Sequence, residues 1–367
     1  MNKFDAAHIS NTVAYANKID RVFNRVINQV ALIASNPAAK FSKSFSFKDN
    51  HTLTKQAGEI FGGMYDDVYG VIGGGIENEW QLSNNKNDVL VNNYVSHLTK
   101  AKEKADWTDR NTQALKAFTE RQVGGIDLSG RVWNLVDQFQ TEMEIQLGLG
   151  ILNGDSSAII SRRMRQYLKD PTALFRRVRN EMGELEWSKA AKAFHPGQGV
   201  YRSAYKNARR LAVTETNAAY RSSDNARWNN LGFVTGFDIV LSGSHPATDM
   251  CDDLKGTYPK NFFFTGWHPQ CLCYAIPSMM KPEDYDKYED AILDGKEAEY
   301  MQKVKGVTDT PQGFKDWIND NIERAPGWKN LPYFMQDNSG YVSRALKDDV
   351  IQRARQIVPE FGKVARV

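Results

Sequence analysis

Apolar residues recur at steps of three and four along the first part of the chain, which is the period of a helix with one buried face. Ile19, Val26 and Val30 are among the residues at these intervals, and Pro37 follows them as a stop. The pattern predicts an amphipathic helix over residues 4–34.

Two stretches predict interruptions of the helices that follow. Gly73-Gly74-Gly75 lacks the Lys-Ser or Lys-Thr pair of a phosphate-binding loop, so we interpret it as a flexible break between helices. Asn84-Asn85-Lys86-Asn87 has the composition of a turn. We expect helices to resume and continue to Tyr167, then a basic helix over 172–187, and a break at His195-Pro196-Gly197.

Residues 201–230 have the pattern of one long helix, and the pattern then changes to that of strands. The run 233–241 is rich in β-branched and aromatic residues and ends at Ser242-Gly243-Ser244. Residues 257–259 predict an edge strand and 271–276 a returning strand. Helices are predicted again over 288–304, from Thr310-Pro311 onward, and over 343–357.

Together these elements predict an α+β fold that is predominantly α-helical. We expect a helical body with a basic C-terminal part over 1–195, a small antiparallel sheet packed on a long helix over 196–280, and a helical region over 281–367. A chain of 367 residues exceeds the roughly 250–300 at which single cores stop growing, so several domains are expected. No apolar run reaches the roughly 18 residues of a membrane span, and residues 1–5 lack the apolar stretch of a secretory signal. We therefore expect the chain to be made in the cytoplasm and to have no association with membranes.

Positive charge is concentrated in the middle of the chain. Over the whole sequence 47 Lys or Arg and 44 Asp or Glu nearly cancel, whereas residues 161–230 hold 15 Lys or Arg and 6 Asp or Glu. Such a region can neutralise phosphates without reading base sequence, and a solvated helix face is the alternative. The candidate DNA-binding residues are Arg162, Arg163, Arg165, Arg176, Arg177, Arg179, Arg210 and Arg221.

One acidic residue lies in a stripe of small residues on the predicted helix over 201–230. Ala208, Ala212 and Ala219 follow one another at helical steps, and Glu215 lies in the middle of their stripe. A carboxylate on a packed surface must be paired or hydrogen-bonded. We expect Glu215 to act as a structural clamp, and a catalytic carboxylate is the alternative. No second carboxylate or nucleophile accompanies it at a spacing that indicates a reaction.

The three cysteines of the chain lie within a short stretch that also contains a histidine. Cys251, His268, Cys271 and Cys273 form a set that can close a tetrahedral zinc site, because thiolates and imidazole are the preferred ligands of that ion. The usual Cys-x-x-Cys spacing is absent. Reduced buried thiols and a disulfide from Cys251 to Cys271 or Cys273 remain alternatives, the disulfide being disfavoured in a reducing cytoplasm.

Three segments of this region resemble the phage Mu F-like head-morphogenesis domain. They are Arg209-Arg210-Leu211-Ala212-Val213-Thr214-Glu215-Thr216-Asn217, then Asp249-Met250-Cys251-Asp252-Asp253-Leu254-Lys255-Gly256, then Trp267-His268-Pro269-Gln270-Cys271-Leu272-Cys273. The resemblance covers about residues 200–277. The sequence departs from it at Leu254, where many relatives carry a second cysteine. Within these segments we expect Arg209, Glu215 and Asp249 to have structural roles.

The resemblance implies a minor head protein of a tailed bacteriophage, present inside the head or at the portal vertex of the virion, associated with the portal protein and with packaged DNA. It implies a structural protein and not an enzyme. The alternative is a metal-dependent nuclease or toxin-like hydrolase that uses Asp249, His245 and His268 around a metal ion, with Glu215 as the base.

Overall fold

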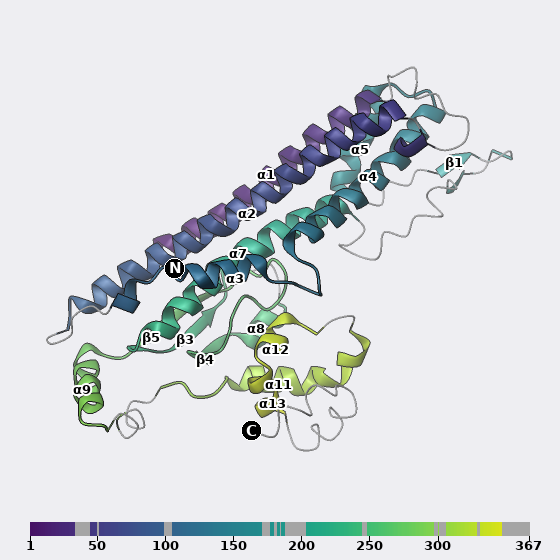
Figure 1. The fold of residues 1–367 in the computed structure, drawn as a ribbon. Coiled ribbons are helices and arrows are strands. Elements are labelled where there is room, and N and C mark those ends of the chain that lie inside the picture. The colour runs from purple at the N-terminus through teal and green to yellow at the C-terminus, as the bar shows by residue number, and fades with distance from the viewer. Residues whose placement is uncertain are drawn as a thin grey trace. The chain divides into compact units, whose positions relative to one another are not determined.

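The computed structural model describes residues 1–33, 45–49, 51–98, 105–170, 177–179, 182–183, 185–187, 203–243, 248–296, 300, 306–328 and 331–346. Its α-helices are α1 (Lys3–Ile33), α2 (His51–Val95), α3 (Thr112–Glu120), α4 (Leu128–Leu152), α5 (Ser157–Lys169), α7 (Ala204–Asn230), α8 (Met250–Leu254), α9 (Pro282–Leu293), α11 (Gln312–Asn321), α12 (Tyr333–Asp337) and α13 (Ser339–Ala345). Short 3-10 helices cover Phe47–Asp49, Ala105–Thr108 and Ile322–Gly327. The strands are β1 (Arg177–Arg179), β2 (Leu185–Trp187), β3 (Val234–Val240), β4 (Gly256–Pro259) and β5 (Tyr274–Met279) (Figure 1).

The predicted fold class is confirmed, because long helices dominate and the strands form small antiparallel sheets. Strand β3 lies between β4 and β5, with Asp238 opposite Thr257 on one side and Ile276 on the other. At Gly236 a Cβ atom would come within 2.8 Å of the Tyr258 carbonyl oxygen, so this position in the central strand requires glycine. None of the described helices is long and apolar enough to cross a membrane.

The chain divides into two compact units, and each unit is built from segments that are not consecutive. Unit 1 comprises Met1–Ser10, Ile76–Thr119 and Thr214–Val367, and unit 2 comprises Asn11–Gly75 and Glu120–Val213. Neither unit coincides with one of the three regions expected from the sequence, 1–195, 196–280 and 281–367. The unit boundaries fall inside helices, because α1, α2, α3 and α7 each contribute residues to both units.

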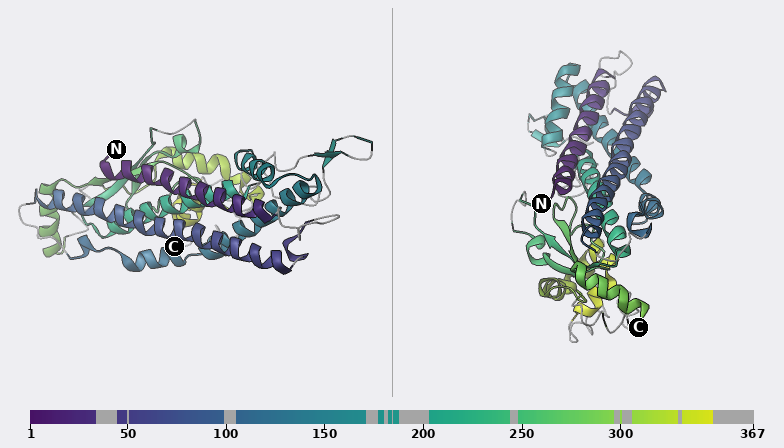
Figure 2. Two further views of the ribbon diagram at one scale, coloured as in Figure 1. Left: turned by 90° about the horizontal axis from the view of Figure 1, so that it is seen from above. Right: turned by 90° about the vertical axis from the view of Figure 1, so that its left-hand side faces the viewer.

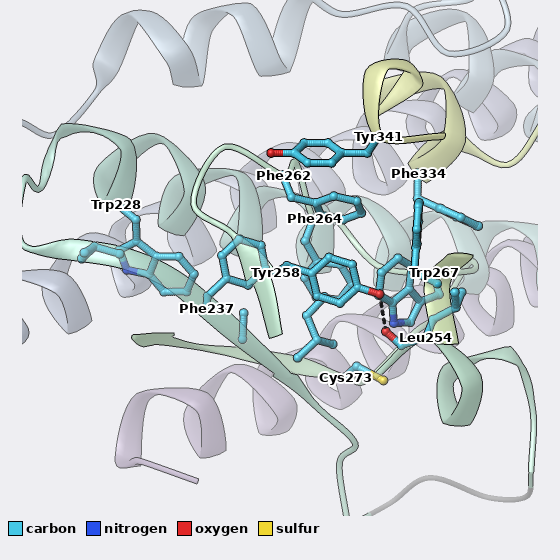
Figure 3. Close-up of a cluster of buried hydrophobic side chains, with 14 of the residues drawn as sticks. Trp228, Phe237, Leu254, Tyr258, Phe262, Phe264, Trp267, Cys273, Phe334 and Tyr341 are labelled. Carbon is cyan, nitrogen blue, oxygen red and sulfur yellow. Dashed lines mark hydrogen bonds between the residues drawn. The ribbon is translucent and has the colours of Figure 1, made fainter. Parts of the chain in front are cut away.

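In unit 1 the sheet packs on the C-terminal half of α7 (Figures 1 and 2). Trp228 of the helix lies 5.6 Å from Phe237 of β3, measured between ring centroids. Figure 3 shows Tyr258 of β4 at the centre of the same cluster, with its hydroxyl donating to the carbonyl of Leu254 across 2.7 Å. Phe334 of α12 packs edge to face on Trp267, which joins the C-terminal helices to this core.

Helix α2 is continuous through both stretches that the sequence predicted as breaks, so that prediction is wrong. The Asn84 side-chain amide donates to the carbonyl of Trp80, and that of Asn87 donates to the carbonyl of Ser83. Both asparagines are buried, so their amides have partners along the helix instead of starting a turn. Nothing lies within 4 Å of a Cβ placed at Gly73 or Gly74, so these glycines are compatible with an uninterrupted helix.

The prediction of a basic helix over 172–187 is also wrong. Strands β1 and β2 pair antiparallel there, with Val178 opposite Glu186. The strands are three residues each, and their β-branched and aromatic residues suit paired strands better than a helix. The predicted break at His195 lies outside the described residues.

Several other predicted elements are confirmed, with shifted ends. The helix expected over 4–34 is α1, the helix expected over 201–230 is α7, and the strand expected over 233–241 is β3. The returning strand expected over 271–276 begins three residues later, as β5. The helix expected to begin after Thr310-Pro311 is α11, whose N-cap is Pro311.

Candidate metal centre

The cysteines are brought together by a five-residue helix and by the loop that leads into β5. Cys251 lies in α8, whereas Cys271 and Cys273 lie immediately before Tyr274, where β5 begins. The Asp249 carboxylate caps α8 by accepting from the backbone N–H of Cys251 across 2.7 Å. Asp252 completes the capping box by accepting from the backbone N–H of Asp249. This cap fixes the short helix and therefore the position of Cys251.

The three sulfur atoms lie within 4.8 Å of one another, and the Sγ atoms of Cys251 and Cys271 are 3.9 Å apart. Their residues are 1%, 1% and 2% exposed for Cys251, Cys271 and Cys273, so the cluster is closed to solvent. His268 adjoins it, with Nε2 lying 3.2 Å from the sulfur of Cys251. The three thiols therefore form one set of donor atoms, and His268 belongs to a second set with Cys251 and Asp249.

The imidazole of His268 is held in one tautomer. Its Nδ1 lies 2.8 Å from the carbonyl oxygen of Pro269, and because a carbonyl can only accept, Nδ1 carries the hydrogen. Nε2 then presents its lone pair on the side of Cys251. A hydrogen bond from the second ring nitrogen to a backbone carbonyl is the usual second-shell arrangement of a histidine that binds a metal. Asp249 adjoins the same nitrogen, with a carboxylate oxygen 3.3 Å away.

The loop that carries the thiols is fixed by a buried arginine of α7. The guanidinium of Arg221 donates to the carbonyls of Thr265, Cys271 and Cys273 across 2.7, 2.6 and 2.6 Å. Asn217, one turn earlier, donates to the carbonyl of Cys271 across 3.0 Å. Because one rigid fork serves three carbonyls, the backbone on both sides of Cys271 is fixed relative to the helix.

The curvature of the loop depends on two backbone positions. Gly266 has a φ of 124°, and a Cβ there would lie 2.6 Å from the Arg221 guanidinium, so a side chain does not fit. Gln270 is left-handed with a φ of 63°, and its N–H donates to the hydroxyl of Thr214. The turn closes where the Cys271 N–H donates to the carbonyl of His268. These bends allow Cys271 and Cys273 to approach the same sulfur.

Hydrogen bonds among the three thiols shift their pKa values in opposite directions. The thiols of Cys251 and Cys273 donate to Cys271 and hold the pKa of Cys271 well below its ordinary value, and the positive charge of Arg221 acts in the same direction. The pKa of Cys251 is raised, first because of its hydrogen bonds to Cys271 and Cys273 and then because of burial. Cys271 is therefore the thiol that loses its proton first.

Arg221 was expected to bind DNA, but it has a different partner. Together with Thr214 and Asn217 it contacts the backbone of residues 265–273. Arg221 is only 5% exposed, so the prediction that it binds DNA is wrong. Nothing in the sequence indicated that backbone carbonyls would be the partners of this arginine.

The remaining candidate residues are dispersed. Arg162 and Arg165 are exposed on α5, where Arg165 donates to Asn28, and Arg163 pairs with Asp155. Arg177 and Arg179 belong to β1, and Arg176 lies outside the described residues. Arg210 is half-buried on α7. Of the residues expected to be structural, Arg209 pairs with Asp20, and Glu215 is buried on α7. His245 of the hydrolase alternative lies outside the described residues.

Unit 1 also contains a buried polar cluster that the sequence did not predict. Asp224 of α7 accepts from the side chains of Ser83 and Asn87 and pairs with Lys86, and Lys86 also pairs with Asp5. The partners of Asp224 are 137 to 141 residues away in the chain, so no local pattern signals this cluster.

The buried thiol cluster has the residue types and the spacing to hold a metal ion. It is built entirely within unit 1, from α7, α8 and the loop before β5. Comparisons with protein-family models, with curated proteins and with solved structures find no match to this chain.

Proposed function

We propose that this chain is a structural protein of a bacteriophage head, associated with the portal and with packaged DNA. The proposal rests on the resemblance of residues 200–277 to the Mu F-like domain, and one observation supports it. The three separate segments that carry the resemblance meet at one place. Thr214 and Asn217 of the first segment hold the backbone of Gln270 and Cys271 in the third, and Cys251 of the second adjoins the same loop.

We further propose that the metal ion is zinc, with Cys251, Cys271, Cys273 and His268 as its ligands. Three thiolates and one neutral imidazole match the donor preference of zinc, and the tautomer of His268 leaves Nε2 available. Zinc with three thiolates carries a net charge of about −1. The guanidinium of Arg221 lies beside Cys271 and offsets that charge.

A site with four protein ligands, of which the three thiols are buried, favours a structural role over a catalytic one. Structural zinc sites are closed, whereas catalytic sites keep an open position for water or substrate. Here zinc would tie α8 to the loop before β5, within a small sheet that has limited apolar area of its own.

Metal analysis of the purified full-length chain tests the zinc proposal. We expect one zinc ion per chain, and we expect Cys251→Ser and His268→Gln to lower that content. His97→Gln is the matched control, because His97 is exposed in unit 1 and far from the thiols in sequence. Substituted cobalt should show the intense absorption of thiolate ligands. A wild-type chain without zinc, or a Cys251→Ser chain with a full complement, would contradict the proposal.

Mass spectrometry of purified virions tests the proposed role in the head, and we expect the chain to be present. DNA binding should fall steeply with salt and show no base preference. Arg162→Glu with Arg165→Glu should weaken it, whereas Lys287→Glu, which reverses an exposed charge on α9, should not. Absence from virions together with no DNA binding at low salt would overturn the proposal. Metal-dependent cutting of DNA would support the hydrolase alternative instead.

A further inference from the structure

Unit 2 carries a row of aromatic and aliphatic side chains, which we call the aromatic ridge: half-buried Tyr65 and exposed Tyr69, Val123, Ile126 and Trp133. Tyr65 of α2 lies between the other two rings, 4.2 Å from Trp133 of α4 and 5.7 Å from Tyr69 between ring centroids. All three rings are nearly parallel, with interplanar angles of 11° and 19°. Trp133 is 43% exposed and Tyr69 is 40% exposed, so the stack opens to solvent at both ends.

The stack is held in place before any partner arrives. The hydroxyls of Tyr65 and Ser129 are 2.8 Å apart and hydrogen-bonded, which joins α2 to the first turn of α4. The central ring therefore has neighbours on both faces and a fixed hydroxyl. Rings ordered in this way lose little conformational entropy when they bind a partner.

A tight turn extends the ridge along α4. Val123 and Ile126 exchange two backbone hydrogen bonds across Gly124 and Gly125, whose φ angles of 62° and 79° fit a two-residue hairpin. Both flanking side chains are exposed. The Ile126 side chain lies over Gly130, and residues 130 and 133 are neighbours on one helix face. The apolar row thus continues from Trp133 to the turn.

The face of α2 beside the rings is rich in glycine. Gly62 and Gly73 lie on the same side of the helix as Tyr69, and a Cβ at either position would meet nothing within 4 Å. Alanine would fit at both positions and would favour the helix by about 1 kcal/mol at each. No contact with the described residues requires glycine there. The open space beside the rings lets another backbone approach α2 closely.

Carboxylates flank the ridge. Exposed Asp66 lies one turn from Tyr69 on α2, and exposed Asp137 lies one turn from Trp133 on α4. These charges repel phosphate, so the rings do not suit stacking by nucleic-acid bases. They also disfavour a symmetric dimer through this face, because it would bring like charges together. Lysine or arginine side chains would pair with the carboxylates and lie over the rings.

We propose that the aromatic ridge is a docking surface for a protein segment that carries lysine or arginine beside aliphatic side chains. The aliphatic groups would cover Trp133, Ile126 and Tyr69, and the cations would meet Asp66 and Asp137. The segment would belong to another protein and would pack close to the glycines of α2. This inference does not depend on the metal centre, which lies in unit 1.

Binding of dye-labelled peptides to the full-length chain, followed by fluorescence anisotropy, tests the proposal. The probe is an amphipathic helical peptide of leucine and lysine. The comparison probes are the same peptide with glutamate in place of lysine and a single-stranded oligothymidine. We expect saturable binding of the lysine peptide only. Trp133→Ala should raise its Kd at least about tenfold, the range of interface hot spots. Trp133→Phe, which keeps a ring on Tyr65, should have a smaller effect.

The double variant Asp66→Asn with Asp137→Asn leaves the apolar row intact and tests the charges separately. It should weaken binding of the lysine peptide several-fold at low salt and much less at high salt. The matched control is Leu293→Ala with Asp294→Asn, which alters an exposed aliphatic residue and an exposed carboxylate near the end of α9. Equal binding by wild type and both ridge variants would overturn the proposal. So would binding of the glutamate peptide or the oligonucleotide as tight as that of the lysine peptide.

Discussion

The guanidinium of Arg221 donates to the backbone carbonyl of Cys271 across 2.6 Å, so a side chain of α7 fixes the residue at the centre of the thiol cluster. Arg221→Met removes the donor to the carbonyls of Thr265 and Cys273, whereas the carbonyl of Cys271 keeps its bond from Asn217. An unpaired buried carbonyl costs about 1–3 kcal/mol, so we expect the free energy of unfolding to fall by about 2 kcal/mol or more. Urea denaturation followed by near-ultraviolet circular dichroism measures the loss.

Arg221→Lys separates charge from geometry in the same experiment. Lysine keeps the positive charge but lacks the planar fork that reaches carbonyls on both sides of Cys271. We expect the free energy of unfolding of Arg221→Lys to lie between those of wild type and Arg221→Met. A loss of less than about 1 kcal/mol in Arg221→Met would show that water replaces the arginine at these carbonyls.

Removing the lysine from the buried polar cluster of unit 1 should lower the free energy of unfolding. Lys86 is 7% exposed and pairs with Asp224 and Asp5, so Lys86→Met leaves two buried carboxylates without their shared cation. Breaking a buried pair by removing one partner costs about 3–5 kcal/mol. The measurement is the free energy of unfolding in urea. Lys287→Met is the control, because it breaks an exposed pair with Asp284 and should cost about 1 kcal/mol or less.

The double variant Lys86→Met with Asp224→Asn tests whether the penalty comes from unpaired charge. Asparagine keeps the acceptor for Ser83 and removes the charge that lysine balanced. We expect the double variant to lose less stability than the sum of the single losses, with a coupling above about 1 kcal/mol. Additive losses would mean that Lys86 contributes through its cation–π contact with Tyr220 and not through its pair with Asp224.

Local patterns in the sequence predicted the helix α7 and the central strand β3, and the short stretch that holds all three cysteines indicated that their thiols could meet. The strand was predicted from the β-branched and aromatic residues of 233–241. The sequence did not predict the continuity of α2, because the composition of Asn84–Asn87 favours a turn until the burial of these amides is known. Likewise, the role of Arg221 depends on carbonyls more than 40 residues away.

In unit 2, Glu142 should make the protein less stable as pH rises. Burial raises the pKa of Glu142 from 4.5 to about 8, and the carboxyl oxygen accepts from the side chain of Gln138 and the backbone N–H of Ala204. Between these two pKa values the folded chain keeps a proton that the unfolded chain has lost. The free energy of unfolding therefore falls as pH rises through that window and levels off above it.

Glu142→Gln should remove this dependence, because the amide is neutral at every pH. Relative to wild type, we expect the variant to gain about 2–4 kcal/mol between about pH 4.5 and about pH 9. Urea denaturation at both pH values measures the change. Glu59→Gln, at an exposed position of α2, should show no such gain. If the two variants behave alike, Glu142 is ionised in the folded protein.

His8 should have the opposite effect on the pH dependence of stability. It should make the protein less stable as pH falls below neutrality. Burial lowers the pKa of His8 from 6.5, and the positive charges of Arg221 and Lys86 also lower it, although the bond to Glu79 opposes both. Above 6.5 the folded and unfolded chains both hold neutral His8. As pH falls, the unfolded chain takes up a proton that the folded chain excludes, so stability is lost with decreasing pH down to the folded pKa.

The slope of stability against pH, and not its value at one pH, is the measurement that isolates His8. His8→Gln also loses the stack on Tyr220, at 4.1 Å between centroids, so it should be less stable at every pH. Below about pH 6.5, however, wild type should lose up to about 1.4 kcal/mol per pH unit more than His8→Gln. His97→Gln, at an exposed histidine of the same unit, should keep the wild-type slope. Equal slopes in wild type and His8→Gln would mean that the imidazole is protonated beside Glu79 in the folded chain, since that pair is 2.6 Å apart.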